Sequence, residues 1–296
     1  MQTLPGHGRF AYSPIVGRPD HDWPGGARLA VYIGFNLEHF AFGEGLGARL
    51  APAAPGVDVL NHSWREYGNR VGAWRCLALF EDLKLPLGAI VNTALADHAP
   101  ELVAACVARG DELIAHGRSN AEAQGDWPRD DERALLAACR ERLAREANGV
   151  PPQGWLSPWI SESRNTPDLL AETGYRYTLD WCHDDQPTRL ATRAGRLWAV
   201  PYPQELNDIP AIVARQMAGA EFADMIVDQF DEMLLQSREQ PLVMGIALHP
   251  YLVGQPHRLK HLRRALQHVA GSTAVWWTTP GRICDAAEAV ASAQSL

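Results

Sequence analysis

The sequence predicts an α/β protein in which strands and helices alternate along the chain. Short runs of strand-forming apolar residues recur through its 296 residues, and segments with helical spacing of apolar residues lie between them. Roughly seven such repeats indicate either a barrel of parallel strands or a doubly wound sheet. Both architectures gather their functional residues at the carboxyl ends of the strands. Polar side chains at those ends are therefore the candidates for catalysis or binding.

The expected strands are apolar runs bounded by turn-forming or polar residues. The first, 28–36, reads RLAVYIGFN and is rich in strand formers. The remaining strands are expected at 87–92, 112–116, 154–157, 175–180, 196–201, 242–249 and 274–279.

The expected helices follow these strands and carry apolar residues three and four positions apart. The helix 166–173 has the clearest boundaries, because Thr166 is a capping residue ahead of a proline and Gly174 ends the run. The Ala/Pro/Gly stretch 48–56 is expected to form a surface loop near the site. The other helices are expected at 69–84, 100–109, 130–147, 220–238, 256–269 and 280–291.

Composition narrows the class of protein. With 46% hydrophobic and 21% charged residues, we expect one catalytic domain over 1–296, of which 1–27 is an N-terminal extension. The formal charge of −8, without a basic block, disfavours nucleic acid and anionic membranes as partners and favours a small molecule. Because the N-terminus has no cationic and apolar leader, the expected location is the cytoplasm. The five cysteines lack CxxC spacing and are expected to be reduced and buried. A nucleophilic role is the alternative for Cys182, which lies between Trp181 and His183.

Three polar side chains at strand ends are candidates for acid–base chemistry. Glu38 lies two residues after Asn36 on one extended segment, so both side chains project to the same side of the mouth of the sheet. His116 and His249 each end an apolar strand, where imidazole serves as a general base or a metal ligand. The alternative for Glu38, which spacing alone favours, is a helix cap or an arginine partner, and a single histidine fits a structural role equally well.

In this order the residues resemble the polysaccharide-deacetylase (NodB-homology) superfamily, from about residue 28 to residue 286. Its first motif corresponds to 35–39 (FNLEH), its metal-binding histidine pair to His116 and Asn120, and its last motif to 248–250 (LHP). The segment LSPW, which begins at Leu156, is similar to a later motif of that superfamily but lacks the arginine common there. The resemblance implies an α/β fold of the incomplete (β/α)7 barrel type.

Longer stretches resemble one branch of that superfamily, which contains the metal-independent type of allantoinase and the cyclic imide hydrolases. These stretches are 61–70 (NHSWREYGNR), 184–187 (DDQP) and 205–210 (ELNDIP). The resemblance implies a hydrolase that acts on C–N bonds other than peptide bonds and opens a cyclic amide such as a hydantoin (allantoin) or a cyclic imide. It also implies a homo-oligomer, for which the tryptophans supply interface material.

Two departures from the superfamily pattern alter the metal site that the resemblance implies. Asn36 stands where an acid serves as base and Asn120 where the second histidine binds metal, so a metal would keep Glu38 and His116 only. Catalytic zinc has three protein ligands and a water. We therefore expect no cofactor, or a weakly held divalent metal. In that case Glu38 or His116 activates the water, His249 acts as the acid, and Asn36, Asn120 or a backbone N–H stabilises the oxyanion.

A cyclic imide or hydantoin presents N–H and C=O groups in one plane, which suits amide and guanidinium partners. Trp159 and Trp181 are candidates for stacking on the flat ring. An alternative for Arg65, Glu66 and Arg70 is a structural ion-pair network at the start of a helix. The expected substrate-binding residues are Asn36, Asn61, Arg65, Glu66, Arg70, Arg118, Asn120, Trp159 and Asp185.

Two other functions stay open at this point. A metal-dependent N-deacetylase of an acetylated amino sugar needs an open groove and a competent metal site, and the missing leader disfavours a cell-wall substrate. A catalytically inactive descendant that binds a ligand is disfavoured by three acid–base groups at three strand ends. The sequence lacks a G-x-S-x-G elbow, a G-x-G-x-x-G fingerprint and a P-loop, which disfavours a serine hydrolase or a nucleotide-binding protein.

Overall fold

Strand β1 (Leu29–Leu37) belongs to a curled sheet, has neighbouring strands on both sides and is buried along its whole length. The computed structural model describes residues 6–53 and 56–293. The nine-stranded sheet has the order β6-β7-β5-β4-β3-β2-β1-β8, and β9 pairs with the first half of β1. The further strands are β2 (Leu87–Val91), β3 (Glu112–Ala115), β4 (Gly154–Trp155), β5 (Tyr177–Thr178), β6 (Thr188–Leu190), β7 (Leu197–Ala199), β8 (Leu242–Leu248) and β9 (Val275–Trp277).

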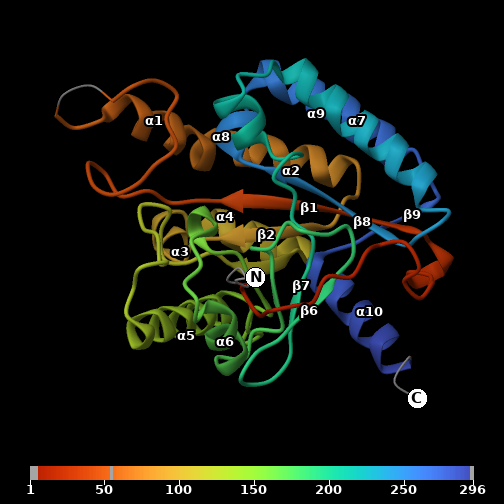
Figure 1. Cartoon of the computed structure of the whole chain (residues 1–296). Helices are drawn as coiled ribbons and strands as arrows, with labels where there is room; N and C mark the ends of the chain where they lie inside the picture. Colours follow the sequence, from red (N-terminus) through yellow and green to blue (C-terminus); the bar gives the residue numbers. More distant parts are fainter. Residues whose placement is uncertain (1–5, 54–55, 294–296) are drawn as a thin grey trace, which may run out of the picture.

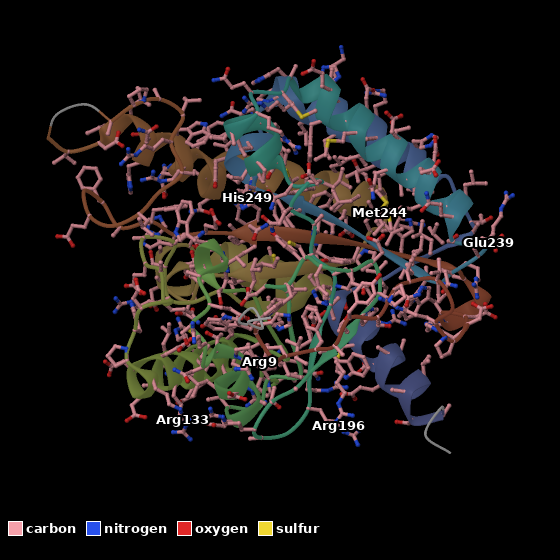
Figure 2. The ribbon with its side chains drawn as sticks, viewed as in Figure 1. Arg9, Arg133, Arg196, Glu239, Met244 and His249 are labelled. Atoms are coloured by element: carbon pink, nitrogen blue, oxygen red, sulfur yellow. The ribbon has the colours of Figure 1, made fainter. Side chains whose placement is uncertain are left out.

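Helices cover the outside of this sheet. Figure 1 shows α2, α7 and α9 on one side of β1 and β8, and α5 and α6 on the opposite side of the molecule. Charged side chains such as Arg133, Arg196 and Glu239 point outward from the surface (Figure 2). The helices are α1 (Val59–Tyr67), α2 (Ala73–Asp82), α3 (Leu95–His98), α4 (Pro100–Arg109), α5 (Arg129–Glu146), α6 (Thr166–Glu172), α7 (Gly219–Gln236), α8 (Pro250–Val253), α9 (Pro256–Ala270) and α10 (Pro280–Ala293).

The sheet curls into a half-barrel, and loop backbone spans part of its open side. The N–H of Ala247 in β8 donates to the carbonyl of Leu206 (3.1 Å), and the N–H of Val243 donates to that of Asp185 (2.9 Å). Strands β1 to β5 and β7 to β9 pair in parallel, whereas β6 is antiparallel to β7, so the sheet is mixed. The predicted incomplete α/β barrel is therefore confirmed.

The two faces of β1 belong to different layers, because side chains alternate along a strand. Phe35 and the other odd-numbered residues pack in the outer layer between sheet and helices, while Tyr32 packs in the interior of the half-barrel. Along this interior face, Tyr32 and Gly34 are followed by Asn36 and Glu38, so the lining changes from apolar to polar toward the carboxyl end. The polar end of the interior is where the site lies.

Most predicted elements are confirmed within a few residues, and the differences concern mainly short elements. The predicted helix 69–84 is α2 preceded by a π-helical turn (Gly68–Gly72), and α1 ahead of it was not predicted. The short helices α3 and α8 and strand β6 were not predicted either. The stretch 48–56 forms the expected loop in its described part, and residues 54–55 lie outside the described residues.

The burial of the cysteines was predicted from the sequence. Four cysteines are buried as predicted (Cys76, Cys106, Cys139 and Cys284), but that prediction is wrong for Cys182, which is exposed. None of the helices in ranges 6–53 and 56–293 is long and apolar enough to cross a membrane.

Candidate active site

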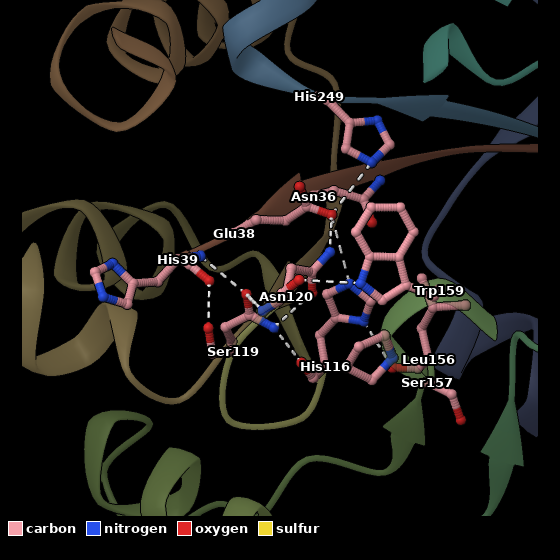
Figure 3. A network of polar contacts seen from close by, with 12 residues as sticks. Asn36, Glu38, His39, His116, Ser119, Asn120, Leu156, Ser157, Trp159 and His249 are labelled. Carbon is pink, nitrogen blue, oxygen red and sulfur yellow. Dashed lines mark hydrogen bonds and ion pairs between the residues drawn. The ribbon is translucent and has the colours of Figure 1, made fainter. Parts of the chain in front are cut away.

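Three strand ends bring their polar side chains to one point. Glu38 follows β1, His116 follows β3 and His249 follows β8. One carboxylate oxygen of Glu38, Oε1, lies 3.6 Å from Nε2 of His116 and 3.4 Å from Nε2 of His249. Figure 3 shows both imidazoles directed at this carboxylate, and Figure 2 places His249 at the far end of β8 from Met244. The three predicted catalytic residues therefore share one site, and their roles stay a prediction.

A backbone carbonyl fixes the tautomer of His116. Its Nδ1 lies 2.7 Å from the carbonyl oxygen of Leu156, which can only accept a hydrogen bond, so Nδ1 carries the hydrogen. In the neutral ring, Nε2 then has a free lone pair that faces Glu38. His116 is thereby oriented as a proton acceptor or a ligand at Nε2.

A buried carboxylate keeps His249 protonated. Asp208 accepts from Nδ1 of His249 (2.6 Å) through Oδ1 and from the backbone N–H of His249 (2.7 Å) through Oδ2. Burial on its own would lower the pKa of His249, but the carboxylates of Asp208 and Glu38 raise it to about 10. His249 is therefore an imidazolium at neutral pH, with the hydrogen on Nε2 directed toward Glu38.

Glu38 is an anion held by hydrogen bonds and by positive charge. Burial on its own would raise its pKa, but the charge of His249 and the contacts with both histidines lower it to about 2. Its Oε1 also accepts from the amide of Asn120 (2.5 Å), and Oε2 accepts from the hydroxyl of Tyr251 (3.0 Å). Glu38 therefore acts as a fixed negative charge between the two imidazoles.

The direction of the Asn120 amide follows from backbone groups around Asn92. The Oδ1 of Asn92 accepts from the N–H groups of His39 (2.9 Å) and Asn120 (3.1 Å), and its amide nitrogen donates to the carbonyl of His116. That nitrogen also donates to Oδ1 of Asn120 (3.0 Å), so the NH2 group of Asn120 is the end that faces Glu38. Asn120 therefore presents a donor to the site, and its oxygen is turned away.

Close packing between two helical segments sets the position of His249. A Cβ on Gly72, in the π-helical turn, would lie 2.1 Å from the carbonyl oxygen of Pro250. A Cβ on Gly254 would lie 2.3 Å from Cα of Gly72, so the two backbones are in direct contact. This contact fixes the start of α8, which carries Tyr251 and follows His249.

The site forms one end of a pocket of about 170 Å³. The pocket is smaller than the roughly 300–1,000 Å³ of sites for drug-sized ligands. Aromatic rings supply much of its wall, and polar groups gather at its base. It is lined by Asn36, Glu38, Phe40, Ala48, His116, Asn120, Leu156, Ser157, Trp159, Ile160, Tyr202, Gln204, Asn207, Ile209, Pro210, His249 and Tyr251.

Trp159 stands at the rim of this pocket in a strained turn. It has φ 61° and Ile160 has φ 52°, which is the left-handed region that bulky residues avoid. The indole N–H of Trp159 donates to the carbonyl of Asn120 (3.0 Å), and 44% of the residue is exposed. The turn thus holds a flat aromatic face beside the polar base (Figure 3).

The residues present do not fit the tight metal site that the deacetylase resemblance implies. Glu38 and His116 could offer ligands, but the Asn120 amide presents hydrogens rather than a lone pair. Nε2 of His249 carries a hydrogen at neutral pH. Within the part of the chain that the structure describes, no cluster of three or more His, Cys, Asp or Glu residues is arranged to hold a metal ion.

Several predicted substrate-binding residues lie outside the pocket. Asn61 is buried and hydrogen-bonds to Leu50, Ala51 and Asp58, so it holds the loop ahead of α1. Arg65 donates to the carbonyl of Ala48 (2.7 Å) and lies over the ring of Phe40, which makes it a support for two pocket residues.

The other charged candidates point elsewhere. Glu66 pairs with His98 (2.8 Å) and Arg118 pairs with Glu122 on the surface. Arg70 and Asp185 are exposed and do not line the pocket. Of the nine predicted substrate-binding residues, the structure places Asn36, Asn120 and Trp159 in the pocket wall.

Sequence reasoning missed three residues of the site. Asp208 lies in the stretch 205–210 (ELNDIP), which resembles the allantoinase branch. That resemblance did not predict a carboxylate beside His249. Tyr202 and Tyr251 each follow a strand by a few residues, and their position near the polar strand ends is the signal that would have found them.

The chain matches no protein-family model. It is 26% identical to a Schizosaccharomyces pombe protein named "Putative polysaccharide deacetylase", over 95% of this chain and 91% of the relative.

Two solved structures extend this comparison to the fold. A Pseudomonas aeruginosa structure titled "probable Polysaccharide deacetylase" has a TM-score of 0.82, 26% identity, and coverage of 92% of this chain and 96% of the other. PuuE allantoinase has a TM-score of 0.80, 26% identity, and coverage of 95% and 98%. The chain is therefore a homologue, in fold and over nearly its whole length, of polysaccharide-deacetylase-type proteins, with an allantoinase among its structural neighbours.

Proposed function

We propose that this protein is a hydrolase that opens a cyclic amide, such as a hydantoin or a cyclic imide, by attack of water. The observation that carries the proposal is the Glu38 carboxylate between Nε2 of His116 (3.6 Å) and Nε2 of His249 (3.4 Å). In its neutral form His116 offers a lone pair at Nε2, and protonated His249 offers a hydrogen. A base and an acid that face the same point are what amide hydrolysis requires.

In the first step, His116 accepts a proton from water at Nε2 while the water oxygen bonds to the ring carbonyl carbon. The π pair of the carbonyl moves to its oxygen and forms an oxyanion. Glu38 is a poor proton acceptor, because its pKa of about 2 lies far below neutral pH. Its charge instead orients the water and stabilises the imidazolium that forms on His116.

In the second step a pair on the oxyanion re-forms the C=O bond, the C–N bond breaks and its electron pair goes to the ring nitrogen. His249 gives the hydrogen on Nε2 to that nitrogen, and Asp208 compensates the charge on the ring while it remains protonated. The products are a carboxylic acid and a free amide or urea nitrogen in one opened molecule. Exchange of protons with solvent returns both histidines to their starting states.

The walls of the pocket favour a small flat ring as the ligand. Phe40, Trp159 and Tyr251 are aromatic, and such faces stack on planar heterocycles. The volume of about 170 Å³ favours one ring rather than a length of polysaccharide. The name of the PuuE allantoinase neighbour agrees with a ring-opening reaction.

The test is a substrate panel with two histidine variants. Allantoin, hydantoin, dihydrouracil, succinimide and a chitooligosaccharide are each incubated with the wild type, with His249→Ala and with His268→Ala. His268 is the matched control, because it pairs with Asp231 on the surface (2.7 Å). We expect ring opening by the wild type and by the control, and its loss in His249→Ala. No turnover of any ring by the wild type would overturn the proposal.

The metal-free form of this mechanism has its own test. Protein purified without added metal is analysed for zinc and assayed with and without a chelator. We expect activity that does not depend on metal content. Stoichiometric zinc together with activity that a chelator abolishes would refute this form.

A second candidate function is N-deacetylation of an acetylated amino sugar, which the names of the S. pombe and P. aeruginosa relatives favour. It predicts release of acetate from the chitooligosaccharide in the same panel. Acetate release without ring opening would establish this candidate in place of the first.

A further inference from the structure

Tyr202 lies inside the half-barrel, between its apolar interior and the polar base of the pocket. The residue follows β7, is 3% exposed and lines the pocket. Gly34 of β1 leaves room for its ring, since a Cβ there would lie 3.1 Å from Cε2 of Tyr202. The ring therefore lies over β1, and its hydroxyl reaches Asn36, which is two residues further along the same face of that strand.

Within the described residues, the hydroxyl hydrogen of Tyr202 makes one long hydrogen bond, to Asn36. The carbonyl of Leu248 can only accept, so the amide nitrogen of Asn36 is the atom that points to it (3.3 Å). The same nitrogen donates to the oxygen of Tyr202 at 2.9 Å. The other contact of this pair, from the hydroxyl to Oδ1 of Asn36, is long at 3.3 Å. The hydroxyl oxygen accepts the shorter of these two bonds, and a ligand oxygen at normal distance would replace the long one as acceptor of its hydrogen.

Gln204 adds a second donor to the same wall. Its side-chain nitrogen is buried and has no hydrogen-bond partner within residues 6–53 and 56–293. Buried donors without a partner are uncommon in folded proteins, because each costs about 1–3 kcal/mol. Tyr202 and Gln204 both line the pocket, so a ligand with carbonyl oxygens would satisfy them.

Two of the oxyanion donors that the sequence offers are already engaged. The NH2 group of Asn36 bonds to Leu248 and Tyr202, and that of Asn120 bonds to Glu38. Each would have to give up a buried partner to reach a ligand. Tyr202 would give up only its long contact with Oδ1 of Asn36 (3.3 Å), and burial raises the pKa of its phenol, which therefore keeps its hydrogen in the working pH range.

We propose that Tyr202 is a catalytic residue whose hydroxyl donates a hydrogen bond to the carbonyl oxygen that becomes the oxyanion. Asn36 is then the positioning residue that turns the hydroxyl, and Gln204 contacts a further oxygen of the same ring. This inference rests on the proposed ring-opening function. The bond strengthens as the oxygen gains negative charge, so it lowers the barrier more than it tightens binding of the substrate.

The test compares Tyr202→Phe with Tyr175→Phe in the wild-type background. Tyr175 is an equally buried tyrosine whose hydroxyl donates to the carbonyl of Leu136 (3.0 Å), away from the pocket. We expect Tyr202→Phe to lower kcat by about 10²–10³-fold, the usual loss of one oxyanion donor, with KM changed by less than about threefold. Tyr175→Phe should keep kcat within about twofold and lose thermal stability only. A Tyr202→Phe variant that is folded and keeps wild-type kcat would overturn the inference.

A second variant tests the hydrogen itself rather than the fold. Replacing Tyr202 with 3,5-difluorotyrosine keeps the ring and the oxygen but lets the phenol lose its hydrogen at lower pH. The decline of kcat on the alkaline side should then move to lower pH, which a purely structural tyrosine would not cause. An unchanged pH profile contradicts the inference.

The two levels of failure are distinguishable. If the wild type opens none of the rings in the panel, the proposed function fails. If it opens one and Tyr202→Phe opens it equally fast, only the role of Tyr202 fails.

Discussion

The replacement Asp208→Asn isolates the charge that keeps His249 protonated. Asp208 is fully buried and uses one oxygen for Nδ1 of His249 (2.6 Å) and the other for its backbone N–H (2.7 Å). In the variant the backbone N–H still needs an acceptor, so the amide oxygen stays with it and the NH2 group faces Nδ1. Nδ1 must then accept, which moves the hydrogen of a neutral ring to Nε2.

The magnitude follows from the loss of the acid. A neutral imidazole N–H is a far weaker acid than an imidazolium, and a positioned general acid contributes roughly 10²–10⁴-fold. We therefore expect kcat to fall by about 10²–10⁴-fold. The pKa of His249, about 10 with Asp208 present, should fall, so the alkaline limb of any residual activity moves to lower pH.

The same change alters how stability depends on pH. The folded pKa of His249 is raised to about 10 from an ordinary value of 6.5. Its contribution to stability is therefore complete below about pH 6.5 and is lost as pH rises through about 10. The stability difference between wild type and Asp208→Asn should shrink across this interval, measured by urea unfolding at several pH values.

Asp168→Asn is the matched control for these measurements. Asp168 is also a buried carboxylate, and it accepts from Arg9 (3.0 Å) and from the backbone N–H of Arg193 (2.7 Å), away from the pocket. It should lower stability and leave kcat within about twofold. If Asp208→Asn keeps kcat within about threefold and shows the same alkaline limb, the assignment of His249 as acid is wrong.

Three further changes test other parts of the site. Gly72→Ala places a methyl group 2.1 Å from the carbonyl oxygen of Pro250, so thermal unfolding should show a loss of about 1–3 kcal/mol, and an unchanged Tm would argue against the close contact. Trp159→Ala removes an aromatic face worth about 0.5–1.5 kcal/mol, so KM for the ring should rise by about 2- to 12-fold, and an unchanged KM would exclude stacking. Glu38→Gln removes a carboxylate whose pKa is lowered from 4.5 to about 2. The wild type should therefore lose more stability than the variant as pH falls from about 4.5 to about 2, and parallel urea-unfolding profiles would contradict the assigned charge.

The central strands could be predicted from sequence because they are buried on both faces. The nine residues of β1 and the seven of β8 are all buried, and such strands read as continuous apolar runs. Helix α1 could not be found in the same way. Its apolar residues Val59 and Leu60 are exposed, while Asn61 and Arg65 are buried beside Trp64, so burial along this helix does not follow hydrophobicity.

The site was predictable where a regular strand carries the residue. Glu38, His116 and His249 follow strands that run in parallel, so strand ends alone place them together. Asp208 and Tyr202 come from irregular segments after β7, whose path depends on tertiary contacts such as the bond from Ala247 to Leu206. The kind of side chain that suits a ligand did not predict which residues face the pocket, because Arg70 is exposed and Arg118 pairs with Glu122 on the surface.

The chemistry available to this scaffold depends on which way one amide is turned. Two backbone N–H groups and one carbonyl fix Asn92, Asn92 fixes the oxygen of Asn120, and the NH2 group of Asn120 then faces Glu38. An imidazole at the same position could offer a lone pair to a cation, whereas the amide offers a hydrogen to an anion. Hydrogen bonds and the positive charge of His249 thus stabilise the carboxylate of Glu38. In the proposed mechanism a base therefore activates the water, and a hydrogen-bond donor of the protein stabilises the oxyanion.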